Sequence, residues 1–469
     1  MGTPTRRVAR GLALAACCAV LAPTPARAQQ RPDNPVPADS LALRVPSRAL
    51  RSIGTGLVVN VAVNRFNMWV LKEDFARVTP SSWMRNLRLG WEWDENQFGT
   101  NMFDHPYHGS LYFNAGRHNG LSYWESIPLA FIGSWTWEYL GERYRPSLND
   151  FVMTSFGGVA LGEIFGRIGA GIRQAAPGSP APLWRELMAL PFDPIGSFDR
   201  LTGGRGRRTH PTMMAHPDAF MLRTYTGIRT TGDREVADSS ARSITALIDF
   251  LYGDPLDTPY TAPFDVFAIR GQVSSGGGLH QLRATGRLYS RNITRPTARH
   301  RHQLTVNQRF EYIDNPAQRY GTQSVELGIH SRWRLSNTLG VRTQAFGNAI
   351  LLGAIDAPDA GVGERDYDFG PGGGVRIEGL LEFRGLPVIA AYAQTEYLRS
   401  VSGATADHVA HFGGLEFTVP VGRDFGIGIH TGYFSRLSRY SDRPEQRREY
   451  PEVRLISTWT IGNTGRSAP

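Results

Sequence analysis

Two histidines three residues apart, His105 and His108, directly follow Asp104 and form a group of side chains that could do chemistry. Imidazole nitrogens and a carboxylate are ligands for a transition metal. A closed metal site needs further protein ligands, and none is marked by its spacing from these residues. We therefore predict no metal and no other cofactor. In this interpretation Asp104 and His105 shape a helix start, and His108 faces a polar interior.

Glu138 and Glu142 lie one helical turn apart, so their charges repel unless a cation lies between them. One interpretation is an ion-paired network that fastens helices together. Its expected binding residues are Arg117, Arg143, Glu163 and Arg167, and Arg145 follows the glutamate pair together with Arg143. The alternative is a carboxylate site in which burial raises a pKa.

A serine beside a histidine could act as the nucleophile and base of an acyl hydrolase. The serines considered are Ser110, Ser126 and Ser147. The candidate catalytic residues as a group are His105, His108, Ser110, Glu138, Glu142 and Asp150. Helix capping already accounts for Ser147 and Asp150, and the chain lacks a Gly-x-Ser-x-Gly nucleophile elbow. We therefore favour a protein without enzymatic activity, with an outer-membrane, lipid-modifying hydrolase as the rival.

Three helices are expected to position these side chains. The first begins at Asp104 or His105, with Pro106 at its first position, and ends near Asn119-Gly120. The box Ser122-x-x-Glu125 begins a second helix over about 123–140. The looser box Ser147-x-x-Asp150 begins a third, to about 171.

The third helix carries small residues every four positions, at Gly158, Gly162, Gly166 and Ala170. Such a face lets another helix backbone approach closely. Because Glu163 and Arg167 would be costly in lipid, we expect this helix inside protein, as a plug in the lumen or at a periplasmic mouth.

The flanking regions are expected to be simpler. Residues 47–75 keep a helical period, and Pro80 closes that region. A short helix spans 183–190, and 192–201 is irregular. The Gly- and Arg-rich stretch 202–211 marks a domain boundary.

From about residue 219 the period of apolar residues changes to two. In 324–334, for example, Val325, Leu327 and Ile329 alternate with polar residues. About twelve such segments follow, many long enough to cross a tilted bilayer. An even number of alternating strands predicts an antiparallel outer-membrane β-barrel. The alternative is a soluble sheet or sandwich, which shows the same alternation.

The N-terminus reads as a secretory signal over residues 1–28, with cleavage after Ala28. Lipoprotein processing at Cys17 is the alternative. Cys17 and Cys18 are the chain's cysteines, so the mature chain has no disulfide or thiol chemistry. Residues 29–46 form a flexible lead-in, rich in proline.

The charge balance points to an envelope protein. Without the four signal arginines, 47 basic residues face 42 acidic ones. This mild excess favours contact with outer-membrane lipids or lipopolysaccharide and possible periplasmic envelope partners, and argues against nucleic acid. We expect the cell outer membrane, with the periplasm as alternative.

The central stretch resembles the family called domain of unknown function 3943. The matching motifs are HPYHGSLYF (105–113), AGRHNG (115–120), SWTWEYLGE (134–142) and PSLNDFVMTSFGGVALGE (146–163). The resemblance covers about 90–200 and implies architecture and envelope location, without an activity. A fainter pattern, Asp104-x3-His108 followed by Ser147-x2-Asp150, is similar to VanZ-like helical membrane proteins.

Together these observations predict an α+β protein. A helical domain over 47–200 is joined by a linker, 201–217, to a barrel over 218–464. The expected role is structural or transport-related, with the helical domain plugging or docking on the barrel. A periplasmic lipid- or glycan-binding protein is a second alternative.

Overall fold

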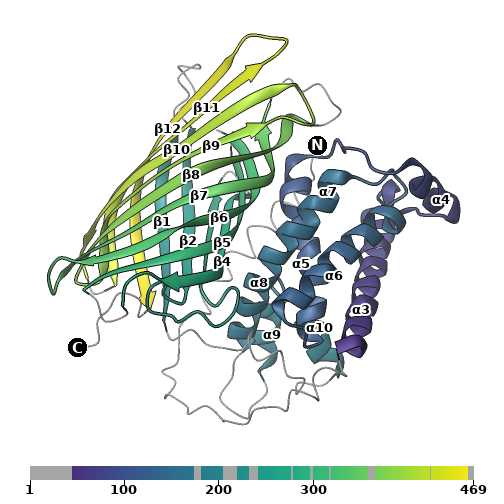
Figure 1. Ribbon diagram of the computed structural model, residues 1–469, viewed down its shortest axis with the longest axis horizontal. Coiled ribbons are helices and arrows are strands. Elements are labelled where there is room, and N and C mark those ends of the chain that lie inside the picture. Colours follow the sequence, from purple (N-terminus) through teal and green to yellow (C-terminus); the bar gives the residue numbers. More distant parts are fainter. Residues whose placement is uncertain are drawn as a thin grey trace. The chain divides into compact units, whose positions relative to one another are not determined.

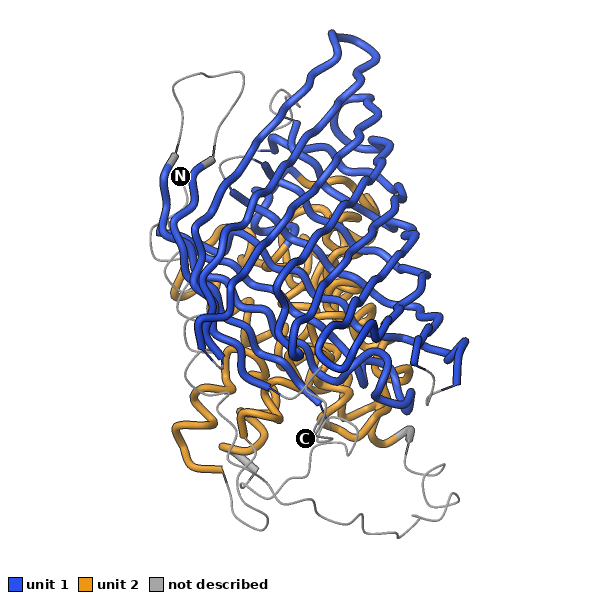
Figure 2. Tube along the Cα trace, turned by 90° about the vertical axis from the view of Figure 1, so that its left-hand side faces the viewer, with its two compact units in different colours: residues 1–18, 95–102, 217–469 blue, residues 19–94, 103–216 orange. Residues whose placement is uncertain are grey.

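The computed structural model describes residues 45–173, 181–203, 219–231, 241–275, 278–295, 299–315, 318–357, 365–422 and 424–462. The chain forms two compact units, coloured separately in Figure 2. Within the described part, one unit holds the helices of 45–94 and 103–203. The other holds the strands together with the short segment 95–102. The expected signal, lead-in and most of the expected linker lie outside the described residues.

The first unit is helical (Figure 1). Its helices are α3 (Val45–Phe66), α4 (Pro80–Leu89), α5 (His105–His118), α6 (Tyr123–Thr136), α7 (Leu148–Val152), α8 (Gly158–Arg173), α9 (Leu183–Ala189) and α10 (Pro194–Gly203). Four π-helical turns adjoin these helices in the described residues: Asn67–Leu71 after α3, Thr100–Asp104 before α5, Trp137–Gly141 after α6, and Met153–Gly157 between α7 and α8. Such turns are rare and are frequent at functional sites.

The start of α6 is the one that the sequence predicted. Ser122 accepts a hydrogen bond from the Glu125 N–H, and the Glu125 side chain accepts one from the Ser122 N–H. The turn before it contains Gly120 with φ +86°, which glycine adopts readily.

The other two expected caps are wrong. The side chain of Asp104 caps nothing, because a π-helical turn runs straight into α5 from the preceding residues. At α7 the Ser147 side chain makes no cap bond. Asp150 points into the interior instead of completing a box, and it is buried.

Two flanking predictions are also wrong. Pro80 begins a helix rather than closing a region, because Thr79 and Ser82 form a capping box around it. The stretch expected to be irregular forms α10, which begins at Pro194. Its register is held by Asp193, whose carboxylate accepts a bond from the Gly196 N–H.

The small-residue face of α8 lies against α5. A Cβ at Gly158 would lie 2.4 Å from the carbonyl carbon of Gly109, so the two helix backbones are in contact. Gly162 faces Phe113 in the same way. The continuous helix Leu148–Arg173 is long and apolar enough to cross a membrane, but 83% of its most apolar stretch is buried. It is the core helix of this unit.

The second unit is a closed antiparallel barrel of twelve strands, as the sequence predicted. The strands are β1 (Phe220–Thr231), β2 (Ala241–Tyr252), β3 (Phe267–Ser274), β4 (Leu279–Asn292), β5 (His300–Asn315), β6 (Gln318–Arg334), β7 (Leu339–Asp356), β8 (Tyr367–Phe383), β9 (Leu386–Arg399), β10 (Ala406–Pro420), β11 (Phe425–Tyr440) and β12 (Gln446–Gly462). Each strand pairs with its sequence neighbours, and β1 pairs with β12 from Met221↔Gly462 to Thr231↔Glu452. Closure excludes the sandwich alternative.

Residues alternate between the two faces of the barrel wall. Large apolar side chains are exposed on the outer face of strands around the barrel. They include Ile228, Ile244, Val325, Leu327, Ile329, Val375, Ile377, Leu415, Phe417, Val419, Ile427, Ile429, Val453, Leu455 and Trp459. The positions between them face inward and are largely polar. This is the pattern of a barrel wall that meets lipid.

The segment 95–102 packs on outward-facing residues of the same barrel. The Phe98 ring stacks on Tyr312 and meets Tyr367 edge to face, with centroids 5.6 and 5.3 Å away. The Tyr367 hydroxyl donates to the Asn96 carbonyl at 2.8 Å and accepts from the Asn101 side chain at 2.8 Å. Both tyrosines are buried.

Candidate functional site

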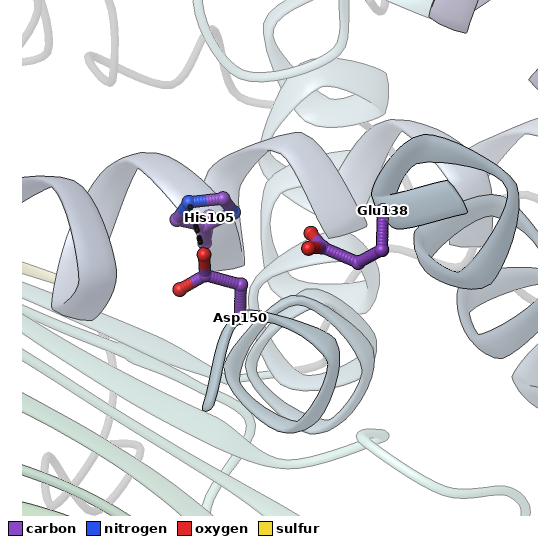
Figure 3. A group of neighbouring side chains, drawn as sticks. All are labelled: His105, Glu138 and Asp150. Atoms are coloured by element: carbon purple, nitrogen blue, oxygen red, sulfur yellow. Dashed lines mark ion pairs between the residues drawn. The ribbon is translucent and has the colours of Figure 1, made fainter. Parts of the chain in front are cut away.

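Three buried side chains converge in the helical unit (Figure 3). His105 is the first residue of α5, Glu138 lies in the π-helical turn after α6, and Asp150 lies on α7. One potential metal-binding atom from each lies within 4.8 Å of the other two. The His105 Nε2 and Asp150 Oδ2 atoms are 3.4 Å apart.

Each of the three residues is held by a contact on its other polar atom. The Thr154 hydroxyl lies 3.3 Å from His105 Nδ1. The Ser147 N–H donates to Glu138 Oε2 at 2.9 Å. The Asn149 side chain donates to Asp150 Oδ1 at 2.8 Å. These contacts leave Nε2 of the histidine and one oxygen of each carboxylate facing the centre.

The cluster is poor in positive charge. Among the described residues, no arginine or lysine forms an ion pair with Glu138, Glu142 or Asp150. Burial raises the pKa of Glu138 well above its ordinary range, and Glu142 raises it further. Burial, and then the charge of Asp94, likewise raise the pKa of Asp150. Both carboxyls therefore hold a proton more tightly near neutral pH than an exposed carboxyl does.

The histidines are neutral at the same pH. Burial lowers the pKa of His105, against the opposing effect of Asp94 and Asp104. Burial and the neighbouring His105 lower the pKa of His108 to about 3. A neutral imidazole is the form that binds metals.

His108 and Glu142 lie beside the cluster with different partners. His108 Nε2 is 2.9 Å from the Tyr112 hydroxyl, which in turn donates to Asn60. Burial raises the pKa of Glu142 to about 7, although the Trp137 indole N–H donates to it at 2.6 Å. His108 and Glu142 therefore bond to the aromatic residues Tyr112 and Trp137, respectively, and not to each other.

The serines are not joined to the histidines in the described part of the chain. The Ser110 hydroxyl donates to the Tyr107 carbonyl at 2.6 Å, and the Ser126 hydroxyl donates to the Ser122 carbonyl at 2.8 Å. His105 and His108 bond to a threonine and a tyrosine instead. The geometry gives no support to a serine–histidine hydrolase.

The expected binding residues divide into three groups. Glu163 is buried and pairs with both Arg117 and Arg167, at 2.8 and 2.9 Å, so these residues fasten α5 to α8. Arg143 instead pairs with Asp74 on the surface. Arg145 pairs with Glu92. The expected pairing of Arg143 and Arg145 with the Glu138/Glu142 pair is wrong.

Sequence reasoning named His105, Glu138 and Asp150 singly but did not join them. They lie 33 and 12 positions apart along the chain. The capping box also explains the spacing of Asp150 from Ser147, so this spacing did not mark Asp150 as a partner of His105 and Glu138. The signal in the sequence was that Glu138 and Asp150 lie on otherwise apolar helices, where unpaired acids are rare and indicate a binding role.

The barrel interior is a second polar region. Arg309 on β5 pairs with Glu311 and Glu326, at 2.7 and 3.1 Å. It also donates to Gln394 across the lumen on β9, at 2.8 Å. Arg376 on β8 pairs with Glu326 at 2.9 Å. This arginine–carboxylate layer crosses part of the lumen.

The connection between β2 and β3 narrows the interior further. Its Asp254 pairs with Arg342 at 2.8 Å, its Asp257 with Arg332 at 2.7 Å, and its Asp265 with Arg287 at 2.8 Å. A polar cavity remains beside the arginine–carboxylate layer. Its lining includes Tyr225, Arg270, Arg283, Tyr392, His430 and Arg454.

The comparisons with known proteins identify one domain in the chain. Residues 90–195 match the family model described as domain of unknown function (DUF3943), so the chain carries this domain at these residues. The comparisons give no support to the VanZ-like pattern. The comparison with curated proteins found no match.

Among solved structures, the chain is similar to the NanC porin, with 10% identity, 51% of this chain and 99% of that chain covered, and a TM-score of 0.27. It is also similar to an outer membrane channel from Pseudomonas putida F1, with 11% identity, 52% and 97% covered, and a TM-score of 0.26. A third is the outer membrane protein opdK from Pseudomonas aeruginosa, with 9% identity, 52% and 100% covered, and a TM-score of 0.19.

Proposed function

We propose that this protein is an outer-membrane β-barrel of the channel type whose lumen is narrowed from within. The observation that carries the proposal is the closed twelve-stranded sheet with an apolar outer face and a charged inner face. Closure satisfies every strand edge, which a sheet in lipid requires.

The interior argues for transport of small polar solutes rather than for a wide pore. The Arg309 layer and the β2–β3 connection occupy part of the cross-section. The remaining cavity is lined by arginine, histidine and tyrosine side chains, which suit hydrated or charged solutes.

Membrane insertion is tested first. The mature chain is expected in the outer-membrane fraction, needing detergent for extraction and giving a heat-modifiable band on unboiled gels. A detergent-free periplasmic species would contradict insertion, and would favour the periplasmic binding alternative.

Transport is tested by conductance in planar bilayers. The wild-type barrel is expected to conduct weakly, and Arg309→Ala to raise the single-channel conductance because it removes the centre of the layer. Arg399→Ala, which breaks an exposed pair with Asp407, is the matched control and should leave conductance unchanged. Absence of conductance in a folded, inserted Arg309→Ala barrel would contradict the channel proposal and favour a structural role.

A further inference from the structure

We propose that His105, Glu138 and Asp150 form a binding site for a first-row divalent cation, Zn²⁺ or Mn²⁺, inside the helical unit. The proposal is independent of transport by the barrel. It rests on the convergence of three ligand atoms, on an unpartnered buried oxygen, and on contacts that orient each ligand.

The ligand set has the right chemistry. Imidazole nitrogen and carboxylate oxygen both bind Zn²⁺ and Mn²⁺, and the described residues include no cysteine, the ligand that softer metals prefer. Two carboxylates and a neutral imidazole carry two negative charges. A divalent cation cancels this charge, which no arginine or lysine of the described residues does through an ion pair with Glu138 or Asp150.

The spacing also fits. With metal–ligand bonds of about 2.1 Å, tetrahedral geometry places two ligand atoms about 3.4 Å apart. The His105 Nε2 and Asp150 Oδ2 atoms are separated by 3.4 Å. The Glu138 oxygen completes the group within 4.8 Å, so a small side-chain movement brings it to a bound cation.

Glu138 supplies the independent sign of a ligand. Its side chain is 1% exposed, and Oε1 has no hydrogen-bond partner. Figure 3 shows its carboxylate pointing toward Asp150 and His105. A buried carboxylate oxygen without a partner is costly, and a bound cation would satisfy it.

The surrounding contacts resemble the outer shell of a metal site. Metal-binding histidines and carboxylates usually bond through their second polar atom, which fixes the orientation of the first. Thr154, Ser147 and Asn149 do this for His105, Glu138 and Asp150 respectively. With three protein ligands, a further coordination position stays open for water or another ligand.

The test is metal binding by the untagged full chain, purified in detergent and stripped with a chelator. Zn²⁺ and Mn²⁺ are titrated separately by calorimetry, and bound metal is counted by mass spectrometry. We expect one equivalent of at least one of the two metals, with affinity falling at least about 100-fold in Glu138→Gln and in Asp150→Asn. Thr154→Val, which removes only an orienting contact, should weaken binding by about 10-fold.

The matched control is Glu92→Gln, a surface glutamate of the same unit that pairs with Arg145. It should bind as the wild type does. Co²⁺ substitution of the wild type supplies a second measurement that does not depend on the folding of any variant. Visible absorption typical of histidine and carboxylate ligands is expected. Absence of saturable binding by the wild type, or unchanged binding by Glu138→Gln, overturns the proposal and leaves a proton-sharing acid cluster.

Discussion

The two units both bury carboxylates, but they treat them differently. In the barrel interior, Glu326 is matched by Arg309 and Arg376. In the helical unit, Glu163 is matched in the same way by Arg117 and Arg167. Glu138 and Asp150, in that same unit, have no such partner among the described residues. The ion-paired acids Glu163 and Glu326 stabilise their units. Glu138 and Asp150, which lack an arginine or lysine partner among the described residues, are the acids that we propose as metal ligands.

The largest expected effect is at the paired acid of the helical unit. Glu163→Gln removes the buried carboxylate that pairs with Arg117 and Arg167, and it should destabilise the unit by about 3 kcal/mol. Hydrogen exchange of the α5 and α8 amides in the full chain measures this. Unchanged exchange would show that the pairing contributes nothing, and would remove the basis of the comparison.

A smaller loss is expected in the barrel. Glu326→Gln weakens bonds to Arg309 and Arg376, but Arg309 keeps Glu311, so the loss should be about 2 kcal/mol. This loss of stability is measured as a fall in the temperature at which the heat-modified band appears on gels. Glu445→Gln, in an exposed pair with Arg439, is the control and should leave that temperature in place.

At the cluster of His105, Glu138 and Asp150, removing an acid is expected to raise stability or leave it unchanged. Glu138→Gln keeps the acceptor for the Ser147 N–H and removes an acid whose pKa burial has raised. Without metal, stability should stay the same or rise, by at most about 1 kcal/mol. The measurement is hydrogen exchange on chelator-treated protein. A loss of stability as large as that of Glu163→Gln would show that Glu138 stabilises the unit as much as the ion-paired Glu163 does.

The smallest effect belongs to the surface. Arg143→Ala breaks a half-exposed pair with Asp74, and such pairs contribute at most about 0.5 kcal/mol. Thermal unfolding of the helical unit should be unchanged within error. A large shift would mean that Arg143 contributes more to stability than its exposed contacts with Asp74 and the Tyr144 ring account for.

The barrel could be predicted because its signal is local. A two-residue period repeats in every strand, and β6 shows it plainly at Val325, Leu327 and Ile329. The start of α6 was predictable for the same reason, since Ser122 and Glu125 lie three residues apart.

The candidate site could not be predicted because it is made by packing. Asp150 follows a serine at capping distance, and a capping box is as good an account of that spacing as a ligand is. Asp150 meets His105 because α5 packs against the continuous helix Leu148–Arg173, and the two backbones touch at Gly109 and Gly158.

The segment 95–102 has a consequence for biogenesis. Its flanking residues, Asp94 and Phe103, belong to the helical unit, whereas Phe98 packs on Tyr312 and Tyr367 of the barrel. The segment is synthesised before any strand, so its aromatic ring has no binding surface until β5 and β8 have formed. The helical unit is therefore linked to the barrel unit by two parts of the chain. One is the segment 95–102 before α5, and the other is the connection after α10. A single proteolytic nick after α10 would therefore leave the two fragments associated.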